Sequence, residues 1–97
     1  MAIQLTRTDD SGSEIWLWFD LDGVEVVAMA YYVIHENTAR LTDFHIDGPG
    51  PNVIGRAGIN AMAALAKGYF GVTTLEIEGY RRTTGANPGH KPRLIIL

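Results

Sequence analysis

Residues 14–34 read EIWLWFDLDGVEVVAMAYYVI, and this stretch decides the fold. Its first third is rich in aromatic and β-branched side chains, which favour a β-strand. Asp22 and Gly23 follow, and Asp-Gly is a common pair in tight hairpins because such turns need positive φ. Residues 24–34 form the returning strand and are apolar on both faces. We therefore predict a hairpin whose second strand lies centrally in a sheet or at an interface.

Further strands and one helix are predicted around this hairpin. The remaining strands cover residues 3–8, 38–46, 72–79 and 93–97. We thus expect an α+β fold: an antiparallel-rich sheet of five to six strands, in the order β-β-β-β-α-β-β, with one helix packed on it. The length of 97 residues and a hydrophobic content of 46% fit a single domain, residues 1–97.

The predicted helix lies between the fourth and fifth strands. It begins at Val53 or Gly55 with Asn52 as its N-cap, and it ends before Gly71, which can take a left-handed C-cap conformation. The prolines and glycines of residues 47–52 predict no regular structure there. One face of the helix carries a stripe formed by Gly58, Ala61, Met62, Leu65 and Tyr69.

Composition restricts the classes of function. The chain has no cysteine, which excludes disulfides and thiolate chemistry. No apolar run approaches the ~18 residues of a membrane helix, and the start lacks a signal-peptide pattern, so we expect a cytoplasmic protein without membrane contact. The net charge is −3, yet all eleven acidic residues lie at or before Glu78 and four of the eight basic residues lie after it. Such a basic tail can bind an anion, or it can pair with the chain's own carboxylates.

The segment of residues 80–92 is the main candidate site. It combines arginines, hydroxyls, an amide, glycines and a histidine without an acidic residue, which suits binding of a phosphate-like anion. A histidine there can donate or accept a proton near neutral pH. We predict catalytic roles for His90, Arg82 and Thr84, and substrate-binding roles for Arg81, Thr83 and Asn87. The alternative is a solvated connection between two strands.

A second candidate lies in the strand of residues 38–46. Strict alternation puts Asp43 and His45 on the same face as Leu41, opposite Phe44 and Ile46. An imidazole beside a carboxylate can be an oriented general base, so His45 is a further catalytic candidate. The alternative is a surface histidine on the solvated side of a sheet. No ligand spacing matches a strong metal pattern, and we predict no metal and no cofactor.

Two weaker candidates remain. Residues 55–59, GRAGI, open the helix, where backbone N–H groups and Arg56 can bind phosphate; Gly58 can equally serve close packing. Trp16 and Trp18 point the same way along their strand. They favour a packing surface or a subunit contact, and thus a possible homodimer, over a platform for stacking bases.

Two stretches, DGPGPN at residues 47–52 and RTTGANPGH at residues 82–90, lie on either side of a helix and a strand. This half of the chain resembles the C-terminal toxin tips of bacterial polymorphic exoproteins, of the Rhs-type and contact-dependent inhibition systems. The resemblance implies a nuclease-type effector acting on RNA, a nucleotide or another phosphate-bearing substrate. It also implies a cognate immunity protein as partner, and delivery into a target cell within a larger exported protein. The acidic pI of about 5.4 departs from the basic surface that is usual in nuclease tips.

Residues 38–79 also resemble GCN5-related acetyltransferases, with a strand, a glycine-containing loop at residues 55–59, a helix and a second strand. That likeness implies a reduced acetyltransferase that binds coenzyme A, although the loop departs from the full signature. Three hypotheses therefore stay open: an effector enzyme in interbacterial competition, a coenzyme A binder, and a non-enzymatic inhibitor or immunity-type binding protein. In the last, acidic residues and the aromatic strands make the contact, and changing His90 has no effect.

Overall fold

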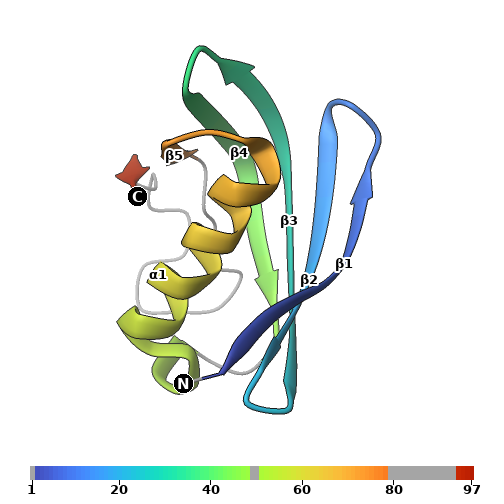
Figure 1. The fold of residues 1–97 in the computed structure, drawn as a ribbon, viewed down its shortest axis with the longest axis vertical. Coiled ribbons are helices and arrows are strands. Elements are labelled where there is room, and N and C mark those ends of the chain that lie inside the picture. The colour runs from blue at the N-terminus through green and yellow to red at the C-terminus, as the bar shows by residue number, and fades with distance from the viewer. Residues whose placement is uncertain (1, 49–50, 79–93) are drawn as a thin grey trace.

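A six-stranded mixed sheet and one helix make up the computed structural model, which describes residues 2–48, 51–78 and 94–97 (Figure 1). The strands are β1 (Ile3–Asp10), β2 (Glu14–Leu21), β3 (Val24–His35), β4 (Thr38–Asp47), β5 (Thr74–Glu78) and β6 (Ile95–Ile96). They lie side by side in sequence order. All neighbours are antiparallel except β4 and β5, which are parallel and connected through the helix α1 (Pro51–Phe70). The predicted α+β fold and its element order are confirmed.

The central hairpin forms as its turn residues predict. Asp22 and Gly23 have φ angles of 51° and 87°, the left-handed conformation that a tight hairpin turn requires. The Asp22 carboxylate also accepts a hydrogen bond from the Ala2 N–H at 2.8 Å, which holds the start of β1 against this turn. The returning strand β3 lies between β2 and β4, the central position that its apolar sequence indicates.

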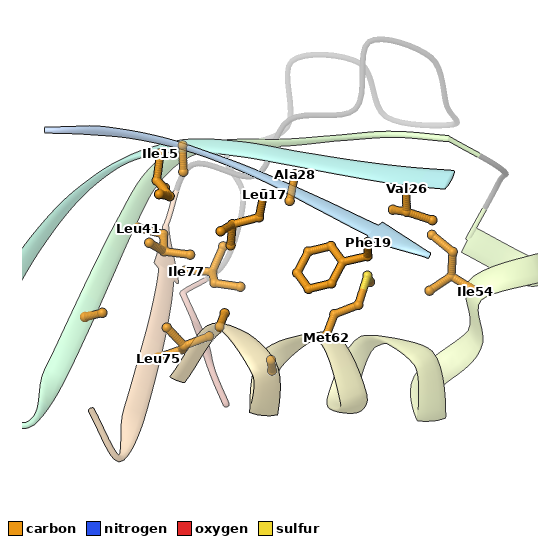
Figure 2. Packing of buried hydrophobic residues seen from close by; sticks show 14 of the residues in the cluster. Ile15, Leu17, Phe19, Val26, Ala28, Leu41, Ile54, Met62, Leu75 and Ile77 are labelled. Carbon is orange, nitrogen blue, oxygen red and sulfur yellow. The ribbon is translucent and has the colours of Figure 1, made fainter. Parts of the chain in front are cut away.

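The core lies between α1 and the sheet face that the helix covers (Figure 2). Alternate residues of β2 are buried on that face, and Phe19, 2% exposed, lies over Met62 of the helix. Burial of a side chain as large as Phe19 contributes about 1.5–3 kcal/mol. The core side chains of the sheet are Ile15, Leu17, Phe19, Leu21, Val26, Ala28, Ala30, Ala39, Leu41, Leu75 and Ile77.

The helix differs from its prediction in the first turn and agrees with it at the C-terminal end. It begins at Pro51, before the predicted Val53, because the first helical turn does not need the N–H that proline lacks. Asn52, the predicted N-cap, consequently lies inside the helix. Gly55, with φ 67° and ψ 173°, interrupts the helix. At the other end Gly71 (φ 71°) forms the predicted cap, and the Val72 N–H donates to the Lys67 carbonyl at 3.0 Å.

The buried face of α1 consists mainly of small residues, which let the helix approach the sheet. Met62, Ala63 and Ala66 are buried there together with Gly58. Tyr69, predicted as part of the apolar stripe, is instead 37% exposed and carries its hydroxyl to β1.

A β-bulge in β4 overturns the predicted alternation of that strand. Asp43 has a φ of 51°, and the pairing of β4 with β3 shifts between Met29 and Tyr31. Beyond the bulge, Phe44 and Ile46 therefore pack against the core, on the same face as Leu41 rather than opposite it. A bulge inserts one residue, and one residue is enough to exchange the faces of a strand.

Candidate functional site

The sheet face that points away from α1, here called the outer face, carries an unusual set of side chains. Its centre is an apolar strip on β2 and β3 that we call the aromatic strip: Trp16, Trp18, Val27, Met29, Tyr31 and Val33. No described element covers these residues, because α1 packs on the opposite face. Tyr31 is 51% and Val33 68% exposed, and both tryptophans are half-buried.

The strip is ordered by cross-strand pairing. Trp16 lies opposite Met29, and Trp18 lies opposite Val27. The two indole rings stack along β2 with centroids 5.9 Å apart and planes inclined by 25°. The Trp16 Nε1–H donates a 2.8 Å hydrogen bond to Glu14 Oε1, which fixes the orientation of the ring. Such cross-strand and aromatic pairs contribute to the stability of the sheet.

Acidic residues surround the aromatic strip. Seven of the chain's eleven acidic residues occupy outer-face positions in the strand register, namely Asp9, Glu14, Asp20, Glu25, Asp47, Glu76 and Glu78. Among the described residues this face has two arginines, and both are engaged. Arg7 lies over the Trp18 ring, 4.6 Å from its centroid, and Arg40 forms an ion pair with Glu78. The described part of the outer face is therefore strongly negative.

A second cluster of polar groups joins β1, β3 and α1. Asp10 Oδ1 accepts hydrogen bonds from the Tyr32 hydroxyl at 2.6 Å and the Gly12 N–H at 2.8 Å, and its Oδ2 accepts from the Tyr69 hydroxyl at 2.7 Å. The Tyr32 hydrogen bond, followed by that of Tyr69, lowers the pKa of Asp10, and the same bond raises the pKa of Tyr32 to about 12. Both hydroxyls already donate to Asp10, so the cluster serves to hold β1, β3 and α1 together.

His45 lies on the outer face opposite Met29 and is exposed. Within the described part of the chain, no hydrogen bond or ion pair connects its side chain to Asp43 or Asp47. The described residues also lack any group of three or more potential ligands that could hold a metal ion. The catalytic role assigned to His45 thus stays a prediction.

Arg56 is exposed on α1, immediately after the interruption at Gly55. The other predicted site residues lie outside the described residues, and their roles stay predictions: Arg81, Arg82, Thr83, Thr84, Asn87 and His90. No helix in the described ranges is long and apolar enough to cross a membrane.

The sequence shows the paired tryptophans and the excess of acidic residues up to Glu78. It does not show that they lie on one sheet face together with four side chains of β3. Val27, Met29, Tyr31 and Val33 recur at every second position of β3, and this period places them on one face. The signal was hidden because the intervening residues of β3 are apolar too.

Comparison of the chain with protein-family models, with curated proteins and with solved structures gives no match. The resemblances to toxin tips and to acetyltransferases therefore stay predictions.

Proposed function

We propose that this protein is a binding protein that contacts a basic surface of a partner protein through its outer face. The observation that supports this proposal is an aromatic strip in the middle of a strongly acidic sheet face. Contiguous exposed apolar side chains with a polar rim are typical of interaction sites. Aromatic residues and methionine are enriched in such interfaces, and a negative rim accelerates encounter with a positive partner.

The charge of the outer face also favours a foreign partner over a second copy of the chain. Two copies that met through this face would bring the seven carboxylates of one copy against the seven of the other, and like charges across an interface disfavour association. A partner with arginines and lysines around an apolar centre would pair with the same groups. This is the behaviour of an inhibitor or immunity-type protein that blocks a basic surface.

Photo-crosslinking from the outer face tests the proposal. p-Benzoylphenylalanine replaces Val33, which is 68% exposed at the end of the aromatic strip, and in a control chain it replaces Ala64 on the exposed side of α1. Both chains are produced in the native cell and irradiated. We expect Val33→p-benzoylphenylalanine to give a discrete adduct with a basic protein, and Ala64→p-benzoylphenylalanine to give none.

Three results would overturn the proposal. Equal adducts from both positions would indicate nonspecific contact, and an adduct with a second copy would make the face a homodimer interface. Peptide mapping that finds Val33 crosslinked to residues 81–93 of the same chain would show that the chain's own basic segment occupies the face.

A triple variant, Glu14→Gln, Asp20→Asn and Glu25→Gln, should reduce the adduct at unchanged stability.

A second candidate function, coenzyme A binding, is favoured by one observation. Gly55 interrupts α1, so that a new helical segment starts at Arg56. This segment belongs to the connection that leads from β4 to the parallel strand β5. The backbone N–H groups at a helix start favour a pyrophosphate. Isothermal titration with coenzyme A tests this candidate, and Arg56→Gln should weaken any binding several-fold. If coenzyme A releases no heat and does not raise the melting temperature, the candidate fails.

A further inference from the structure

We propose that Trp16 is the receptor for an arginine side chain of the partner, and this inference rests on the proposed function. The outer face already binds one guanidinium in this manner. The Arg7 guanidinium carbon lies 4.6 Å from the centroid of Trp18, within the range of a cation–π contact. The chain's own arginine is thus an example of the contact that we infer for Trp16.

Trp16 has a setting similar to that of Trp18, but among the described residues no cation lies over its ring. In the register of β1 and β2, Trp18 lies opposite Arg7, whereas Trp16 lies opposite Asp9. Residues opposite each other in an antiparallel pair have Cβ atoms about 5 Å apart on the same face. The position that holds a guanidinium beside Trp18 is therefore held by a carboxylate beside Trp16.

Two carboxylates border the Trp16 ring. Asp9 is exposed and makes no ion pair with the described residues, and Glu14 binds the indole N–H at 2.8 Å through Oε1. A cation above the ring would interact with the π-face and with both negative charges. Met29 on the other side of Trp16 supplies an apolar wall for the methylene chain of the incoming residue.

The geometry favours arginine over lysine. A guanidinium is planar, stacks on an aromatic face and is less strongly hydrated than an ammonium group. Its fork of N–H groups can also reach a neighbouring carboxylate while the plane stays on the ring. We therefore expect discrimination between the two cations, which a purely electrostatic surface would not give.

Titration followed by the indole N–H resonances in ¹H–¹⁵N spectra tests the inference. The probes are a capped Gly-Arg-Gly-Arg-Gly peptide and its counterpart with lysines, and Trp18→Phe assigns the two resonances. We expect the Trp16 resonance to shift saturably with the arginine peptide, at least about threefold more tightly than with the lysine peptide. Asp9→Asn with Glu14→Gln should weaken binding of the arginine peptide at Trp16, because the two groups beside the ring are then neutral. The matched Asp20→Asn with Glu25→Gln, at the other end of the strip, should weaken it much less.

Substitution of Arg7, the arginine over Trp18, tests the inference independently. Arg7→Gln should expose Trp18 and create a second arginine-sensitive resonance, since that ring then lacks its own cation. Equal responses to both peptides, or unchanged binding of the arginine peptide in Asp9→Asn with Glu14→Gln, would overturn the inference. If Val33 still crosslinks a basic partner in that case, the proposed function survives without the arginine receptor. Arginine binding at Trp16 with no crosslink would instead retain the receptor and reject the proposed function.

Discussion

Asp10 shows how a single exposed carboxylate can join distant parts of this small protein. It binds the hydroxyls of Tyr32 and Tyr69 and the N–H of Gly12 at 2.6–2.8 Å. Phe70 packs against both tyrosine rings, with centroids 4.9 Å and 5.2 Å away, and so orients the hydroxyls. The lowered pKa of Asp10 means that the folded state favours its ionised form.

Asp10→Asn should therefore lower the free energy of unfolding by roughly 0.5–1 kcal/mol at pH 7, a modest loss because the groups are solvent-exposed. The folded pKa lies below the ordinary 3.8, so this stabilisation is present above about pH 4 and is lost as the pH falls through the folded pKa. Urea unfolding of both proteins at pH 7, 5 and 3 measures the difference. A difference that does not shrink at pH 3 would contradict the assignment, and Asp9→Asn is the control expected to change little.

At alkaline pH the stability that comes from these hydrogen bonds falls as the pH rises, because the tyrosine hydroxyls then ionise. The pKa of Tyr32 is raised to about 12 by its bond to Asp10, so the associated stability is complete below about pH 10 and is lost as the pH approaches 12. The loss should be larger in the wild type than in Tyr32→Phe, which has no hydroxyl to titrate. Thermal unfolding at pH 8, 10 and 11.5 would reveal it, and identical pH profiles for the two proteins would exclude this role.

His90 distinguishes the binding account from the effector-enzyme hypothesis. If the protein acts through its outer face, His90→Ala and Arg82→Ala should leave the Val33 crosslink unchanged. Tightly induced expression of either variant or of the wild type should then have the same effect on bacterial growth. Growth arrest by the wild type but by neither variant would contradict the binding account and support catalysis by the segment of residues 80–92.

At the scale of elements, the interruption of α1 makes the clearest prediction. Gly55 has φ 67° and ψ 173°, a conformation restricted almost entirely to glycine, although a side chain there would meet nothing within 4 Å. Gly55→Ala should therefore destabilise the protein by about 1–3 kcal/mol through backbone strain alone.

Gly68→Ala is the matched control, because Gly68 lies in the regular part of the same helix, also with nothing within 4 Å. It should stabilise the protein by roughly 0.5–1 kcal/mol, since alanine favours a helix over glycine. Denaturant unfolding compares both variants with the wild type. Equal effects of the two substitutions would show that Gly55 is not strained in solution.

The elements that sequence predicts well are those with local chemical causes. The hairpin at Asp22 and Gly23 and the helix end at Gly71 each depend on a glycine that permits positive φ, so a short window suffices. The bulge at Asp43 has no such local cause. It arises from the pairing of β4 with β3, and nothing in residues 38–47 marks where one residue is added. This one residue moved Phe44 and Ile46 to the core face and changed the surroundings of His45.

The candidate site was predictable in its composition but not in its placement. Aromatic residues in β2 and acidic residues before Glu78 are visible in the sequence. Their convergence on the outer face depends on which side of the sheet α1 covers, and alternation alone does not decide this for the doubly apolar strand β3.

At the scale of the whole molecule, the two faces of the sheet differ in what covers them and in charge. α1 covers the inner face, and the outer face combines the aromatic strip with seven carboxylates. Because both proposals need this face to be open and negative, attachment to a partner should weaken as salt rises. A crosslinking yield from Val33 that is independent of salt between 50 and 500 mM would argue for a purely apolar contact.

Fluorescence quenching tests the openness and charge of the outer face most directly, because both tryptophans of the chain lie on it. The account predicts that acrylamide quenches the emission readily. It also predicts that caesium quenches more strongly relative to iodide than it does for free N-acetyltryptophanamide, with the larger bias in Trp18→Phe, where Trp16 alone reports beside Asp9 and Glu14. Emission that is blue-shifted and resistant to acrylamide, or a preference for iodide, would contradict the account, because the face would then be covered or not negative.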